Sequence, residues 1–154
     1  MNNLLQADQI NAHFSKAAKS YEQGARLQRE VAFDALRFLA AQQHGTLLDL
    51  GCGPGWFHHN LSSHCDHLVA LDLSAAMLQQ AKRHGIANEF IQADAAAIPL
   101  PEHSVDTVFS SLMLQWCADP AAVFAEIARV LKPGGRFVLT TLVEESMFEF
   151  QQAW

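Results

Sequence analysis

The chain has 154 residues, of which 50% are hydrophobic and 17% charged, and its formal net charge is −6 at pH 7; this length suits one domain with a substantial core. The acidic balance, without a run of lysine or arginine, disfavours a nucleic-acid substrate, because cationic side chains that neutralise phosphates supply most of that affinity. No apolar run reaches the roughly 18 residues of a membrane span, and the first residues lack a signal-peptide pattern.

The first part of the chain predicts two helices. Apolar residues recur at helical spacing from Ile10 to Tyr21 and again from Leu27 to Leu39, and Gly24 marks a break between the two stripes. We therefore expect an N-terminal helical segment over residues 1–44, followed by an α/β domain over residues 45–154.

The remainder alternates between strand and helix patterns. Ser74 and the pair Asp119-Pro120 are typical helix starts. Strands that alternate with helices imply right-handed crossovers, so we expect a mostly parallel sheet flanked by helices. The predicted strands are 46–50, 67–72, 88–93, 105–111 and 136–142, and the predicted helices are 55–62, 75–84 and 120–131.

A glycine-rich turn follows the first predicted strand, in the segment from Asp49 to Gly55 that reads DLGCGPG. Its glycines leave backbone N–H groups open to a ligand at the carboxyl end of the strand. Asp72 ends the second predicted strand about 20 residues later, where a carboxylate can accept hydrogen bonds from ribose hydroxyls. The sequence thus predicts a nucleoside cofactor bound across the first two strands.

The spacing of the turn bears on which cofactor binds. An NAD-dependent oxidoreductase would fit the strand ends, but its fingerprint is G-x-G-x-x-G, whereas Gly51, Gly53 and Gly55 give G-x-G-x-G. The carboxylate of Asp49 suits a cationic sulfonium better than a pyrophosphate. The pattern resembles the first motif of the class I S-adenosylmethionine-dependent methyltransferases, which have a Rossmann-like fold. Taken alone, the glycines would fit any tight turn from strand to helix.

This resemblance implies roles for residues at several strand ends. Asp49 would orient the amino-acid end of S-adenosylmethionine, Asp72 would hold the ribose, and Tyr21 would form a lid or simply pack on the sheet. For Met77, ordinary packing within a helix is an interpretation as good as a contact with the cofactor. The implied contacts of the other residues are Gly51 and Gly53 with the cofactor's amino-acid end, Leu73 and Met77 with the faces of adenine, Asp94 and Ala95 with its edge, and Ser110, Ser111 and Leu112 with the methionine moiety.

Two further segments narrow the resemblance. Residues 14–29, which include Tyr21, and the segment Leu112-Met113-Leu114-Gln115-Trp116-Cys117 are similar to the malonyl-acyl-carrier-protein O-methyltransferases of biotin synthesis. The resemblance implies methyl transfer to the free carboxylate of a malonyl thioester on acyl carrier protein or coenzyme A. That carboxylate is already ionised at neutral pH, so no general base is needed and we assign no catalytic residue.

Other functions are also compatible with these residues. A methyltransferase for a quinone precursor or another small metabolite would share the same cofactor half, and a cofactor-binding module without activity would too. Gln115 and Trp116 are candidates to line an acyl pocket, although a tryptophan buried beneath the loop is the simpler interpretation.

The end of the chain differs from this family. Its members close the sheet with two more strands, so we expect a C-terminally truncated sheet. The cation for the malonyl carboxylate would then follow Trp154. The edge of the fifth strand would be open to aggregation, dimerisation or strand exchange.

Histidines and cysteines between the first two strands raise a metal hypothesis. His58 and His59 are adjacent and would point about 100° apart on a helix, so we favour a solvated helix end over a metal site. The three well-separated cysteines, without a C-x-x-C pair, indicate reduced thiols in a cytoplasmic protein.

Overall fold

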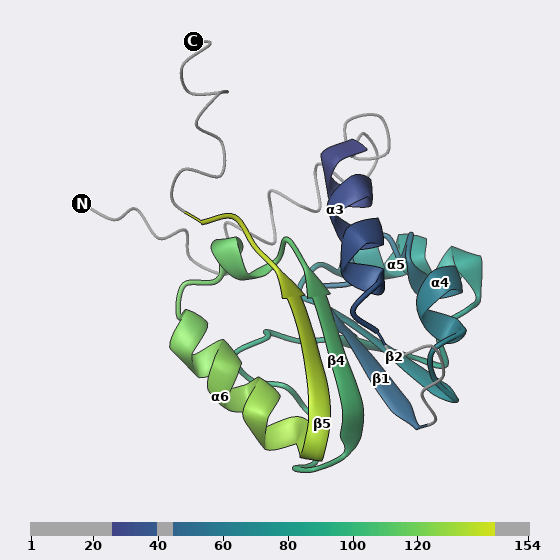
Figure 1. The fold of residues 1–154 in the computed structure, drawn as a ribbon. Helices are drawn as coiled ribbons and strands as arrows, with labels where there is room; N and C mark the ends of the chain where they lie inside the picture. The colour runs from purple at the N-terminus through teal and green to yellow at the C-terminus, as the bar shows by residue number, and fades with distance from the viewer. Residues whose placement is uncertain (1–25, 40–44, 144–154) are drawn as a thin grey trace, which may run out of the picture.

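The computed structural model describes residues 26–39 and 45–143, which form a five-stranded sheet with helices on both faces (Figure 1). The strand order is β3-β2-β1-β4-β5, and every neighbouring pair is parallel. The strands are β1 (Thr46–Leu50), β2 (His67–Asp72), β3 (Glu89–Gln92), β4 (Val105–Ser111) and β5 (Leu131–Thr140). The first predicted helix, with Tyr21, lies outside the described residues.

The order of the strands sets the place for a ligand. The chain runs outward from β1 through β2 to β3, and then crosses to the other side of β1 to form β4 and β5. In open α/β sheets, ligands bind outside the carboxyl ends of the strands at the point where the order reverses. Here that point lies between β1 and β4.

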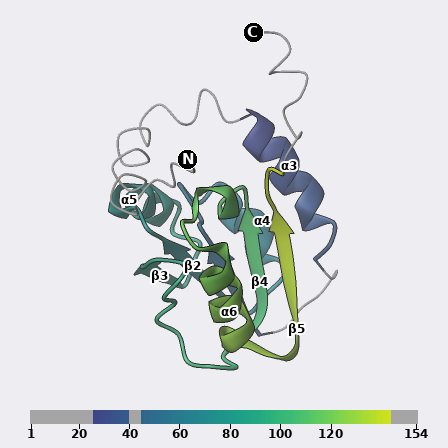
Figure 2. The same ribbon diagram turned by 90° about the vertical axis from the view of Figure 1, so that its left-hand side faces the viewer.

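The core has two layers because successive residues of a buried strand face opposite sides of the sheet. Leu48 and Val108 face α6 (Pro120–Val130), whereas Leu47 and Phe109 face α3 (Arg26–Leu36) and α4 (His58–Ser62). Figures 1 and 2 show α6 on one side of the sheet and α3 and α4 on the other. Both faces are therefore covered, as a parallel sheet requires.

Most predicted elements are confirmed. Strands β1, β2 and β4 and helix α5 (Ala75–His84) have the predicted bounds, β3 is one residue shorter at each end, and α6 ends at Val130. Ser74 and Asp119 cap their helices as expected, accepting hydrogen bonds from the N–H groups of Met77 and Ala122.

Two local predictions were wrong. Helix α4 begins at His58 rather than at residue 55, because Gly55 has a φ of +76° and cannot open a right-handed helix. Strand β5 spans Leu131–Thr140 rather than residues 136–142, and its pairing with β4 is irregular between Val105 and Thr107. The second predicted N-terminal helix is confirmed as α3, which ends at Leu36, and Leu27 and Phe38 of its apolar stripe are exposed. None of the helices in the described part of the chain is long and apolar enough to cross a bilayer.

Candidate cofactor-binding site

The glycine-rich turn folds over the end of β2. The backbone N–H groups of Gly51 and Cys52 both donate to the carbonyl oxygen of Leu71, at 2.8 and 3.0 Å. Gly51 has a φ of +76°, and a Cβ atom there would collide with the side chain of Met113. Only glycine satisfies both requirements, so this position joins the turn after β1 to the corner after β4.

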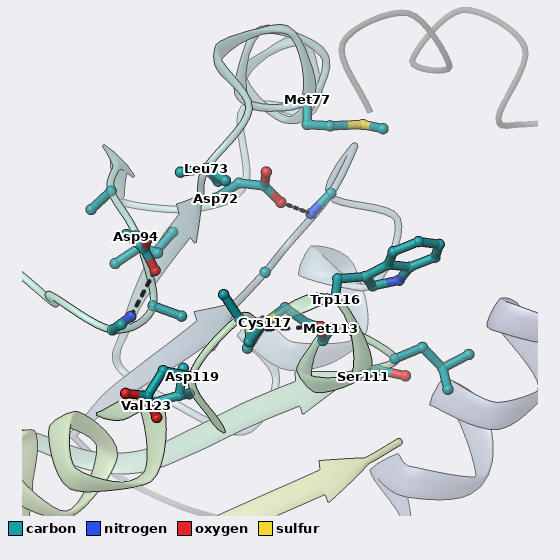
Figure 3. Close-up of a pocket in the computed structure, with 18 residues that line it drawn as sticks. Asp72, Leu73, Met77, Asp94, Ser111, Met113, Trp116, Cys117, Asp119 and Val123 are labelled. Carbon is teal, nitrogen blue, oxygen red and sulfur yellow. Dashed lines mark hydrogen bonds between the residues drawn. The ribbon is translucent and has the colours of Figure 1, made fainter. Parts of the chain in front are cut away.

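Asp72 is the central polar residue of the site. Its Oδ2 accepts a hydrogen bond from the N–H of Gly53 at 2.8 Å (Figure 3). Its Oδ1 accepts one from the N–H of Ser74, also at 2.8 Å. Burial raises the pKa of this carboxyl despite these hydrogen bonds, and the nearby Asp49 raises it further. Because each carboxylate oxygen has two lone pairs, both can accept another hydrogen bond from a ligand.

A cavity of about 270 Å³ opens at the carboxyl ends of the strands. In Figure 3, residues that follow β2 and β3 lie on one side of it, and residues that follow β4 lie on the other. Its charged lining residues are three carboxylates, and the described lining contains no lysine, arginine or histidine. The lining residues are Gly51, Gly53, Leu71, Asp72, Leu73, Met77, Ala93, Asp94, Ala95, Ala96, Ser111, Leu112, Met113, Trp116, Cys117, Ala118, Asp119 and Val123.

Most of the residues singled out in the sequence line this cavity together. They are Gly51, Gly53, Asp72, Leu73, Met77, Asp94, Ala95, Ser111 and Leu112. Tyr21 lies outside the described residues, so its lid role stays a prediction. Asp49 and Ser110 are the two described members of the set that are not among the lining residues.

Asp49 and Ser110 instead support the site from within the core. The Ser110 hydroxyl is fully buried and donates to the carbonyl oxygen of Leu50 at 2.8 Å, which ties β4 to β1. Asp49 is buried, and its Oδ2 lies 3.3 Å from the Nε2 of His58. Neither side chain forms part of the cavity wall.

The expectation of a solvated helix end was wrong for His58. This ring is completely buried, and neither nitrogen has a hydrogen-bond partner, although the Nε2 lies close to the Asp49 carboxylate. His58 is the first residue of α4 and faces the core, whereas the adjacent His59 is exposed. The described residues contain no group of three His, Cys, Asp or Glu arranged to hold a metal.

The corner after β4 contributes residues that were not assigned a definite role from the sequence. Trp116 is the last residue of the short helix η1 (Leu114–Trp116); it lines the cavity and is 39% exposed, so it is not buried beneath the loop. Gln115 is not among the lining residues. The Cys117 Sγ lies 3.1 Å from the Met113 Sδ, and burial, followed by the charge of Asp94, raises the pKa of this thiol to about 11.

The segment from Leu112 to Cys117 was the sequence signal for Met113, Trp116 and Cys117. The contributions of Ala118, Asp119 and Val123 had no such signal. The Asp119 side chain was expected only as a helix cap, yet it also lies at the cavity.

This fold and cavity define a Rossmann-like α/β domain with a ligand site at the point where the strand order reverses. The chain belongs to the methyltransferase domain family, whose model matches residues 48–139.

Two curated relatives and one solved structure illustrate the similarity. A malonyl-acyl-carrier-protein O-methyltransferase of Yersinia pestis is 42% identical over 147 residues, which cover 94% of this chain and 54% of that protein. A biotin biosynthesis bifunctional protein BioHC of Cellvibrio japonicus is 42% identical over 143 residues, covering 92% of this chain and 28% of that protein. The DhpI-SAM-HEP complex has a TM-score of 0.74 and 26% identity, and the match covers 100% of this chain and 73% of that one. The chain thus spans about half the length of the Yersinia relative.

Proposed function

We propose that this chain binds S-adenosylmethionine in the cavity and belongs to an enzyme that methylates the free carboxylate of a malonyl thioester carried on acyl carrier protein, an early step of biotin synthesis. The observation that carries the cofactor assignment is the cavity at the strand-order reversal, with both oxygens of Asp72 held by backbone N–H groups. The acceptor assignment is supported by the identity to malonyl-acyl-carrier-protein O-methyltransferases over nearly the whole chain.

The nucleoside would lie on the β2 and β3 side of the cavity. In this proposal Asp72 accepts hydrogen bonds from the ribose hydroxyls, because its position at a strand end and its two anchored oxygens suit a vicinal diol. Leu73 and Met77 contact the faces of the adenine ring, and Asp94 and Ala95 contact its edge. All four line the cavity.

The amino-acid end would lie between the glycine-rich turn and the corner after β4. Gly51 and Gly53 allow close approach to the main chain, and Ser111 and Leu112 border the methionine moiety. Asp49 acts through the turn rather than by direct contact, because its carboxylate faces His58.

The charges of the cavity suit a sulfonium. Asp72, Asp94 and Asp119 line it without a cationic lining residue in the described part of the chain. The negative potential of these side chains attracts a cationic cofactor and repels the carboxylate of an acceptor. We therefore place the cation that pairs with the malonyl carboxylate outside the described lining residues.

Little chemistry is required of the side chains. When bound, S-adenosylmethionine supplies an activated methyl group with its own leaving group. The acceptor carboxylate is ionised at neutral pH and needs no general base. What the protein contributes is alignment of the acceptor oxygen with the methyl carbon and the sulfur, and exclusion of water.

The N-terminal segment, residues 1–44, is proposed as a cover for the site, with Tyr21 above the methyl group. Helix α3, within this segment, contacts the residue that follows the glycine-rich turn, since the Arg29 guanidinium lies 4.5 Å from the centre of the Trp56 ring. We also propose a cytoplasmic location, because Cys52, Cys65 and Cys117 are free thiols.

Calorimetry and a labelled-methyl assay test the proposal together. The chain should bind S-adenosylhomocysteine, and the absence of binding would refute the cofactor assignment. A protein extended to the length of the relatives is then offered malonyl-acyl carrier protein, malonyl-CoA and a quinone precursor. Transfer to a malonyl thioester supports the acceptor assignment, and comparison of the two carriers gives the preference. Transfer to the quinone precursor alone, or binding without any transfer, contradicts it. Sedimentation of the same samples tests dimerisation through the edge of β5.

A further inference from the structure

Leu112 has an unusual backbone conformation at the wall of the cavity. Its φ is +53°, in the left-handed region that residues other than glycine and asparagine rarely adopt. Such a conformation persists only where neighbouring contacts hold it in place. The residue directly follows β4 and directly precedes Met113, so its conformation sets the path of the corner.

Two hydrogen bonds fasten the peptide groups of this residue. The N–H of Leu112 donates to the carbonyl oxygen of Thr140 at the end of β5, at 2.8 Å. The carbonyl oxygen of Leu112 accepts a hydrogen bond from the Nε2 of Gln115, also at 2.8 Å. The strained residue is thus held from both sides, once by the sheet and once by a side chain.

The side chain of Gln115 is itself oriented by the residue that follows β5. Its Oε1 accepts a hydrogen bond from the hydroxyl of Thr141 at 3.2 Å. With the Oε1 occupied in this way, the Nε2 faces the carbonyl of Leu112. A flipped amide would instead place the Oε1 against the carbonyl oxygen of Leu112, and two acceptors repel each other. Both Gln115 and Thr141 are partly buried, and neither lines the cavity.

The fastened corner reaches the glycine-rich turn through Met113. The Met113 side chain lies so close to the Cα of Gly51 that no Cβ fits between them. A change at Leu112 therefore shifts the surface on which the turn rests. The sequence of contacts runs from Thr141 to Gln115, Leu112, Met113 and finally Gly51.

We propose that Gln115 is a positioning residue for the cofactor site, oriented by Thr141 and acting through the left-handed Leu112. The inference rests on the proposed function, because it assumes that the cavity holds S-adenosylmethionine. Gln115 touches neither cofactor nor acceptor. It sets the shape of the cavity wall that borders the methionine moiety.

Three variants of the 154-residue chain test this inference. Thr141→Val removes the hydroxyl at nearly constant shape, Thr141→Ser retains it as the matched control, and Gln115→Met removes the amide from a side chain of similar length. Calorimetry measures the affinity for S-adenosylhomocysteine, and amide hydrogen exchange without ligand measures protection of the Leu112 N–H. The N–H of Asn88, which donates to Leu68 at the opposite end of the sheet, is the internal reference.

Thr141→Val and Gln115→Met should weaken binding roughly five- to tenfold, the scale of one net hydrogen bond. They should also accelerate exchange at Leu112 but not at Asn88, and Thr141→Ser should stay within about twofold of the wild type on both measures. Unchanged affinity in Thr141→Val and Gln115→Met overturns the inference alone, provided that the wild type binds. Exchange that rises equally at Leu112 and Asn88 also overturns it, because that pattern indicates general destabilisation. If the wild type does not bind S-adenosylhomocysteine, the proposed function fails, and this inference fails with it.

Discussion

Asp49 and His58 face each other beneath the glycine-rich turn, with the Oδ2 of the carboxylate 3.3 Å from the Nε2 of the ring and both side chains buried. The ring also lies under Gly55, where a Cβ atom would come within 2.8 Å of the His58 Nδ1. The pair therefore fills the space under the turn and gives the buried carboxylate a polar partner.

Replacement of His58 should destabilise the fold. In His58→Leu the carboxylate of Asp49 stays buried without that partner, which should lower the free energy of unfolding by about 1–3 kcal/mol. Urea denaturation monitored by circular dichroism measures the change. His59→Leu is the matched control, because His59 is exposed on the same helix and should change little. Equal stabilities of the two variants would contradict the supporting role of the pair.

Two glycines of the turn should respond differently to alanine. Both have a positive φ, but a Cβ atom at Gly51 collides with Met113, whereas nothing lies within 4 Å of one at Gly53. Gly53→Ala should cost about 1–2 kcal/mol from backbone strain alone, and Gly51→Ala should cost more. Gly51→Ala should cost less stability in a Met113→Ala background than in the wild type, because the smaller side chain relieves the collision. The double variant therefore recovers part of the loss. A double variant with no such recovery would show that the collision is not the cause.

Asp72→Ala should weaken binding of S-adenosylhomocysteine by about 1–3 kcal/mol if the carboxylate holds the ribose. Calorimetry measures the affinity, and Asp34→Ala, on the exposed face of α3, is the control. An affinity equal to that of the wild type would mean that the nucleoside lies elsewhere.

The pH dependence of stability should carry the signature of Asp72. Its pKa is raised by burial in the folded chain, so between the ordinary carboxyl pKa and the raised value the folded state binds more protons than the unfolded state. Its contribution to stability therefore falls as the pH rises through that window, and the cost is complete above it. Subtracting the unfolding profile of Asp72→Asn from that of the wild type isolates this slope. A difference that rises with pH would have the wrong sign.

Arg129 should matter for the loop that bears Asp94. Its guanidinium donates to the carbonyl oxygens of Ile98 and Leu100, at 2.7 and 2.8 Å, and pairs with Glu126, which accepts from the N–H of Ile98. Arg129→Lys cannot reproduce this forked geometry. It should therefore lower the midpoint of thermal unfolding more than Arg83→Lys at an exposed position of α5. Equal midpoints would show that the fork contributes nothing.

The parallel sheet was predictable because the signals were local. Apolar runs that end in Asp72 or in the glycine-rich turn define strand ends, and the carboxyl ends of parallel strands share one edge. Together with the family resemblance, this reasoning identified half of the residues that line the cavity.

The interior of the site was not predictable in this way. The His58 ring lies so close to Gly55 that a Cβ atom there would collide with it, and this packing could not be seen in the sequence. The inward position of Asp49 and the left-handed Leu112 depend on contacts with residues distant in the sequence. Those contacts exist only once the sheet has formed, so residue spacing carries no sign of them.

The irregularity within β5 has a practical consequence. Strand β5 has more residues than β4 between the pairs Val105–Leu131 and Thr107–Arg136. One of them, Gly134, is exposed, and nothing lies within 4 Å of the position of a Cβ atom there. From Thr107 onward the pairing continues without interruption to Ser111 and Thr140. Differences in chain length are thus absorbed at the end of the molecule remote from the cavity. A peptide tag or a fluorophore grafted beside Gly134 would therefore report on the protein without touching its chemistry.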